Sequence, residues 1–200
     1  MEQITNILYW LSTGLLIPVT IALILLFAYS LVLLGIMHST RIQRSRLNTP
    51  LNRQINANTP MAQLLAELPN ADQHSPLGCT LQHVRQHSNH ALLLDKITGD
   101  YEIATNRLLN RSRLLAKVGP MLGLMGTLIP MGPALVGLAT GDIASMASNM
   151  QVAFATTVVG IIVGAVGFIS LQVQQRWVAD DLNILSYIVE TLKQNGHEQQ

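Results

Sequence analysis

The sequence predicts an all-α integral membrane protein with three transmembrane helices and long cytoplasmic helical extensions. Hydrophobic residues make up 49% of the 200 positions and charged residues only 12%, and the mean hydropathy is +0.34. This composition is unusual for a soluble domain. Three long apolar stretches contain no Asp, Glu, Lys or Arg, and each can cross ~30 Å of hydrocarbon as a helix rising ~1.5 Å per residue.

The predicted spans are residues 14–37, 118–139 and 146–173. A signal peptide is the rival interpretation of the first stretch, but it would need a basic segment before a shorter apolar core of ~7–15 residues. No Lys or Arg precedes Gly14, and the apolar run is too long. We therefore expect a first membrane helix rather than a cleaved leader.

The basic residues predict the orientation of the chain. Residues 1–13 and the short turn 140–145 contain no Lys or Arg, whereas many basic residues follow the first span and two follow the third. By the positive-inside bias, the N-terminal segment 1–13 and the turn 140–145 lie outside. The insertion 38–117 and the tail 174–200 are then cytoplasmic and helical.

Proline and glycine residues divide the insertion into separate predicted segments. Residues 48–60 are polar and contain two prolines, which predicts a break, and residues 61–68 form a short predicted helix. From Leu77 onward, apolar residues recur near helical spacing and predict one or two amphipathic helices that lead into the second span, with Gly99 as an interruption. A similar stripe continues after the third span to about Lys193.

One group in the insertion could bind a metal ion. Its members are spaced four, four and three residues apart, so they would share a helix face: Cys79, His83, His87 and His90. Thiolate and imidazole are zinc ligands. However, Pro76 and Gly78 place the cysteine at a helix start, and no second cluster would close a tetrahedral site. An exposed polar face is the favoured interpretation, and we predict no metal and no cofactor.

Signals for catalysis and for nucleic-acid binding are absent. The sequence lacks the G-x-S-x-G, H-E-x-x-H and phosphate-loop motifs, and the spans contain no paired carboxylates. The net charge of +1 is spread without a basic face of the kind that nucleic acids require. We therefore predict a protein that is not an enzyme and that contacts the lipid bilayer.

Glycines in the second and third spans predict close helix packing. Several are four residues apart, a spacing that lets helix backbones approach in lipid. The predicted packing residues are Gly119, Gly123, Gly126, Gly160, Gly164 and Gly167, and Gly137 and Gly141 have the same spacing. Pro130 and Pro133 lie deeper in the second span, where they should kink the helix and free carbonyl groups.

Two segments carry a family resemblance. The segment "GPMLGLMGTL" followed by "AFATTVVGI" resembles the paired signature of the MotA/TolQ/ExbB proton-channel family, over residues 116–177. The resemblance implies that Thr127 and Thr157 line a pore, and the adjacent Thr156 makes the assignment on the third span ambiguous. Gly164 and Gly167 stand where the family often has a proline, which leaves the subfamily open.

Ions that cross hydrocarbon need a titratable carrier or a wet path, and these spans contain no carboxylate. The resemblance implies a homo-oligomer, a pentamer, that encloses a single-span partner of the MotB/TolR/ExbD kind with a membrane Asp. It also implies the inner membrane of a prokaryote. The expected function is that of a stator subunit that conducts ions, namely protons, and converts ion-motive force into mechanical work across the envelope. The alternative is a non-conducting scaffold that assembles partner proteins.

Overall fold

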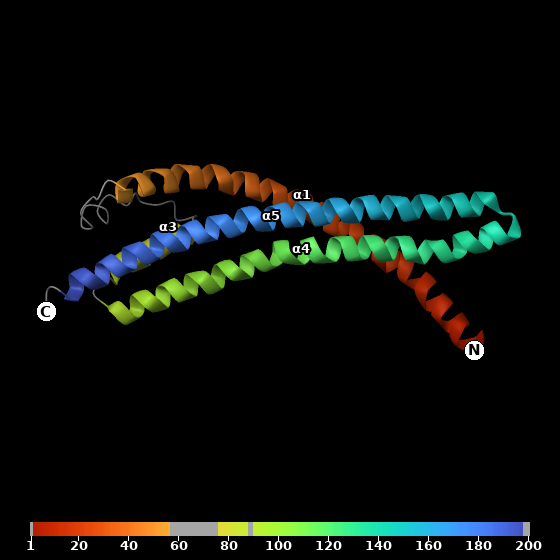
Figure 1. Cartoon of the computed structure of the whole chain (residues 1–200), viewed down its shortest axis with the longest axis horizontal. Coiled ribbons are helices and arrows are strands. Elements are labelled where there is room, and N and C mark those ends of the chain that lie inside the picture. Colours follow the sequence, from red (N-terminus) through yellow and green to blue (C-terminus); the bar gives the residue numbers. More distant parts are fainter. Residues whose placement is uncertain (1, 57–75, 88–89, 198–200) are drawn as a thin grey trace. The chain divides into compact units, whose positions relative to one another are not determined.

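The computed structural model describes residues 2–56, 76–87 and 90–197. These residues form helices and contain no strand. The helices are α1 (Glu2–Asn56), α3 (Pro76–Gln86), α4 (Ala91–Thr140) and α5 (Ile143–His197), and α4 and α5 run antiparallel from a tight turn (Figure 1). The all-α fold class is therefore confirmed.

Three of the helices are long and apolar enough to cross a membrane. The candidate segments are Thr13–Arg41 within α1, Ala91–Thr140 and Ile143–Gln194. Each has the apolar run that the sequence predicts, so the prediction of three helices able to span a membrane is confirmed. The positions at which each helix enters and leaves the bilayer, and the boundaries of the predicted segments, stay predictions.

The break expected from residue 48 is wrong as far as the described residues reach. Helix α1 continues through Pro50 and ends at Asn56. A proline in a long helix removes one hydrogen bond and can bend the helix without ending it, because the neighbouring turns keep their own bonds. The predicted short helix 61–68 lies outside the described residues.

Gly99 does not interrupt the chain before the second span. Helix α4 passes through it, and a Cβ placed there would meet no atom within 4 Å. The helix boundary falls earlier, between Gln86 and Ala91. There the carbonyl oxygen of His90 accepts bonds from the N–H groups of Leu93 and Leu94, at 3.0 and 3.1 Å, which starts α4.

The chain divides into two compact units. The first, here the hairpin unit, comprises Met1–Gly35 and Arg111–Leu171, and the second, here the extension unit, comprises Ile36–Asn110 and Gln172–Gln200. In the hairpin unit, α1 buries a stripe at helical spacing, consisting of Val19, Leu23, Ser30 and Leu33. Burial along one face only is typical of a helix packed on neighbours with its other side toward lipid.

The extension unit has an apolar core built by α3, α4 and α5. Its buried members are Leu77, Leu81, Val84, Leu94, Tyr101, Ile184, Leu185, Ile188 and Val189. One buried polar pair lies in this core, since the Tyr101 hydroxyl donates to Oδ2 of Asp181 at 2.6 Å. Near the outer edge, Lys193 donates to Asp95, also at 2.6 Å.

Candidate functional site

Helices α4 and α5 are joined by a turn of two residues, Gly141 and Asp142. Gly141 has a φ of +76°, and its N–H donates to the carbonyl of Leu138 at 3.2 Å. The N–H of Asp142 donates to the carbonyl of Gly137 at 2.8 Å. These two bonds form a Schellman motif, which satisfies the last carbonyls of a helix and favours glycine at the left-handed position.

Asp142 begins α5 as well as ending the turn. Its carboxylate oxygen Oδ1 accepts a bond from the N–H of Ser145 at 3.0 Å, and its carbonyl accepts from the N–H of Met146 at 3.2 Å. Asp142 is therefore an N-cap, which sequence analysis missed. In the sequence, the signal for this N-cap is an Asp that follows Gly141 directly and lies three residues before Ser145. The two caps together reverse the chain within two residues.

Below the turn, α4 and α5 approach backbone to backbone at glycines. A Cβ placed on Gly160 would lie 2.6 Å from Cα of Gly123 and 2.9 Å from the carbonyl oxygen of Gly119. A Cβ on Gly164 would lie 2.5 Å from the ring of Pro120. Real Cβ atoms could not be accommodated without a shift, so these glycines set the distance between the helices.

The other predicted packing glycines also face the opposite helix. A Cβ on Gly119 would lie 2.9 Å from the backbone nitrogen of Gly164, and one on Gly167 would lie 2.5 Å from that of Ala116. Gly126 lies against a side chain instead, because a Cβ there would be 2.6 Å from both Cβ and Oγ1 of Thr156. The register thus places Gly126 and Thr127 at the level of Thr156 and Thr157.

The three predicted pore threonines occupy two different environments. Thr156 is 7% exposed and lies against Gly126, inside the contact between the helices. Thr127 and Thr157, each one residue further along its helix, are half-buried. Of the three, Thr127 and Thr157 therefore lie at the edge of the contact, where a further molecule could reach them.

All three threonine hydroxyls bond to their own helix. Thr127 donates to the carbonyl of Leu124 at 2.7 Å, and Thr157 donates to that of Ala153 at 2.9 Å. Thr156 lies within bonding distance of the carbonyls of Val152 and Ala153, at 3.0 and 2.9 Å. Such bonds make a hydroxyl tolerable in lipid, and they leave the oxygen free to accept.

The Cys/His group of the extension unit does not come together as a metal site. Among the described residues, no three His, Cys, Asp or Glu side chains are grouped so that they could hold an ion. Cys79 is exposed, and Nδ1 of His87 lies 3.1 Å from the carbonyl oxygen of His83. His90 lies beyond the end of α3, just before α4.

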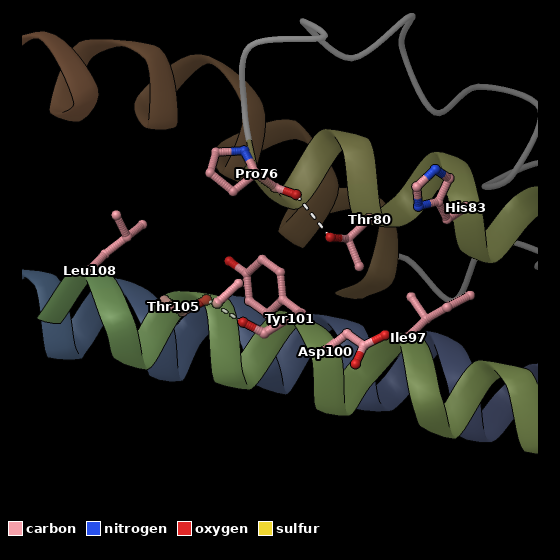
Figure 2. A pocket seen from close by; sticks show the side chains of 9 residues that line it. Pro76, Thr80, His83, Ile97, Asp100, Tyr101, Thr105 and Leu108 are labelled. Atoms are coloured by element: carbon pink, nitrogen blue, oxygen red, sulfur yellow. Dashed lines mark hydrogen bonds between the residues drawn. The ribbon is translucent and has the colours of Figure 1, made fainter.

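His83 instead lines a cavity of about 260 Å³ between α3 and α4. In Figure 2, Thr80 and His83 lie on α3, and Ile97, Asp100 and Tyr101 lie on α4 below it. Thr80 donates to the carbonyl of Pro76 at 2.9 Å, which closes the first turn of α3. Of Cys79, His83, His87 and His90, only His83 is among the residues that line this cavity, so the cavity does not bring the four together.

The buried pair in the extension unit is not apparent from the sequence. Asp181 is 2% exposed, although an unpaired carboxylate is rarely buried. The sequence does contain one signal for this burial. Asp181 lies on the apolar stripe after the third span, four residues before Leu185 and seven before Ile188. The partner Tyr101 is 80 residues away and could not be found from local spacing.

Comparison with protein families gives one match. A model of the MotA/TolQ/ExbB proton channel family matches residues 73–186, more than half of the chain. The chain belongs to the MotA/TolQ/ExbB proton channel family. The match extends beyond the two signature segments to include α3 and the first half of α4. Comparison with curated proteins and with solved structures gives no significant match.

Membership in the MotA/TolQ/ExbB family establishes the general type of function. The family is a proton-channel and transport family of membrane proteins rather than a class of enzymes, and its members work with partner proteins in membranes. The glycine-packed pair of α4 and α5 carries both signature segments of this family. The hairpin unit is therefore the candidate site of ion conduction.

Proposed function

We propose that this chain is the ion-conducting, proton-carrying stator subunit of a machine that converts ion-motive force into mechanical work across the envelope. The observation that carries the proposal is the pair Thr127 and Thr157. These hydroxyls lie at one level of a hairpin whose spans contain no carboxylate. A titratable group must then come from another chain.

The proposed partner is a single-span protein of the MotB/TolR/ExbD kind with an Asp inside the membrane. A ring of copies of this chain, a pentamer by family membership, would enclose it. Protonation of that Asp would remove its charge and let the partner helix move relative to the ring. The exposed apolar side chains along the spans, including Met121, Leu128, Phe154 and Ile161, suit contact with lipid and neighbouring copies.

The test is reconstitution with the co-purified partner. Native mass spectrometry would give the composition of the complex, and proton flux would be measured in liposomes. Thr127→Val with Thr157→Val should abolish flux and leave assembly intact. Thr140→Val is the matched control, because Thr140 donates to its own helix in the same way but lies at the end of α4. Full flux in the double variant would refute the pore role.

A non-conducting scaffold is the second candidate. The satisfied threonine hydroxyls and the close glycine contacts favour it, since packing alone requires no more. A scaffold would bind partners yet show no proton flux in liposomes at any partner ratio. It would also keep its full assembly activity in the double threonine variant.

We also propose that the chain lies in the inner membrane of a prokaryote, with its N-terminus outside and the extension unit in the cytoplasm. The basic residues after the first and third spans support this orientation. Cys79 is the single cysteine of the chain and is exposed, so it is a built-in probe. A membrane-impermeant maleimide should label it only after permeabilisation. Ala144→Cys in a Cys79→Ser background should be labelled from outside.

A further inference from the structure

Helix α4 presents an exposed face with both basic and apolar side chains just before its predicted span. Arg111, Leu114 and Lys117 follow one another at intervals of three residues, and side chains at this spacing are neighbours on a helix. All three are exposed, and Leu114 is 60% exposed. Met121, seven residues after Leu114, is 62% exposed, so the same face continues into the span as apolar surface.

The two cations of this face have no carboxylate near them in the hairpin unit. That unit contains two acidic residues, Glu2 at the start of α1 and Asp142 in the turn. Asp142 follows the far end of α4, ~37 Å along the helix from Lys117 at ~1.5 Å per residue. The ion pairs found among the described residues lie in the extension unit. A second hairpin unit at the same level would therefore add positive charge and no counter-charge.

The face lies at the predicted edge of the bilayer. The predicted span begins at Val118, so Lys117 is at the hydrocarbon boundary and Arg111 is ~9 Å further out along the axis. Side chains of a helix lean toward its N-terminus, which carries the Lys117 ammonium away from the hydrocarbon and toward Leu114. The polar headgroup layer beside the hydrocarbon is ~5–8 Å thick. Both cations can therefore reach one phosphate group in this layer.

We propose that Arg111 and Lys117 bind the headgroup of an anionic phospholipid, with Leu114 and Met121 against its glycerol and acyl parts. Guanidinium and ammonium groups donate charge-assisted hydrogen bonds to phosphate oxygens. A free phosphate ion would leave the exposed apolar part of the face in water, whereas a lipid covers it. A zwitterionic lipid carries its own cation, so the face favours a headgroup with net negative charge. This inference does not depend on ion conduction, since it requires only that α4 crosses a bilayer.

Photo-cross-linking of the full chain in liposomes identifies the molecule that covers the face. The photoreactive p-benzoylphenylalanine replaces Leu114, and the vesicles contain equal amounts of phosphatidylglycerol and phosphatidylcholine with the same acyl chains. A basic residue near an anionic surface strengthens binding about fivefold, so we expect phosphatidylglycerol adducts to exceed phosphatidylcholine adducts about tenfold or more. Equal adducts with the two lipids overturn the proposal, as do adducts with a protein chain in place of lipid.

Leu135 is the positional control for the cross-link. It is 61% exposed on α4, and α4 contains no charged residue after Lys117. The same photoreactive residue in place of Leu135 should react equally with the two lipids. A preference for phosphatidylglycerol at both positions would assign the effect to the vesicle and overturn the site.

A double variant tests the two cations. Arg111→Gln with Lys117→Gln should lower the adduct ratio at position 114 to about one. Arg85→Gln with Lys96→Gln is the matched control, because it removes the same charge from exposed positions of the extension unit and should keep the ratio. Equal loss in both double variants would assign the preference to net charge and overturn the site.

A salt titration tests the same point in a chain that keeps both cations. Raising the ionic strength from about 0.05 M to about 1 M shortens the Debye length to roughly 3 Å. The adduct ratio at position 114 should then fall toward one, and the ratio at position 135 should stay constant. A ratio at position 114 that does not respond to salt overturns binding through Arg111 and Lys117.

Discussion

The phenol of Tyr101 and the carboxylate of Asp181 form a buried hydrogen bond of 2.6 Å between α4 and α5. Tyr101 is 6% exposed and Asp181 is 2% exposed, and both lie within the apolar core of the extension unit. A charged acceptor in such surroundings depends on its donors, because the low local dielectric makes a lost bond costly. The pair therefore ties α4 to α5 through two residues that lie 80 positions apart in the sequence.

Tyr101→Phe removes the donor and keeps the ring. We expect the free energy of unfolding of the extension unit to fall by about 1–3 kcal/mol, the cost of losing a hydrogen bond to a charged group. Amide hydrogen exchange of α3 and of the last turns of α5 would measure it. Tyr187→Phe on the exposed side of α5 is the control and should have little effect. Equal exchange in the two variants would contradict the assignment.

Gly160→Ala should destabilise the hairpin unit by about 1–3 kcal/mol, because an added Cβ would meet the backbone of Gly123 at 2.6 Å and the helices would have to separate. Gly132→Ala is the matched control, since a Cβ there would meet nothing within 4 Å. It should be neutral or stabilising by up to about 1 kcal/mol from helix propensity. Thermal unfolding in detergent compares the two. A stable Gly160→Ala variant would show that the close contact is not required.

Gly141→Ala tests the turn. The φ of +76° at this position costs an L-residue about 1–2 kcal/mol, so the variant should unfold at lower temperature. Gly141→Asn should lose less, because asparagine tolerates the left-handed region better. The expected order of thermal stability is Gly, then Asn, then Ala. Equal stability of Asn and Ala would argue against backbone strain as the cause.

The pair of Lys193 and Asp95 predicts a dependence on alkaline pH. The hydrogen bond to Asp95 raises the pKa of Lys193 above its ordinary value of 10.5, against a smaller opposing effect of desolvation. A raised pKa means that the pair contributes its stability below pH 10.5 and loses it as the pH rises through the elevated value. Asp95→Asn should remove this part of the pH dependence. Hydrogen exchange or thermal unfolding would compare the stability of the unsubstituted protein and of Asp95→Asn between pH 9 and 12. The difference in stability between the two should narrow at the alkaline end.

The sequence by itself determined the fold class, the three spanning helices and the family. Each depends on local information, namely the length of an uncharged apolar run or a short motif such as the one that contains Thr127. The spacing of the glycines also predicted close helix packing. Local spacing could not show that α1 continues through Pro50, because the effect of one proline depends on the helix on either side.

Only the tertiary structure decided which surfaces meet. It placed Thr156 against Gly126, and it left Thr127 and Thr157 at the edge of the contact. It also showed that Tyr101 pairs with Asp181. The turn between α4 and α5 consists of Gly141 and Asp142. These features follow from the register between two helices, which is set by close contacts between distant residues. The spacing of apolar residues predicts which face of one helix is buried. Which surface packs against that face depends on how both helices pack.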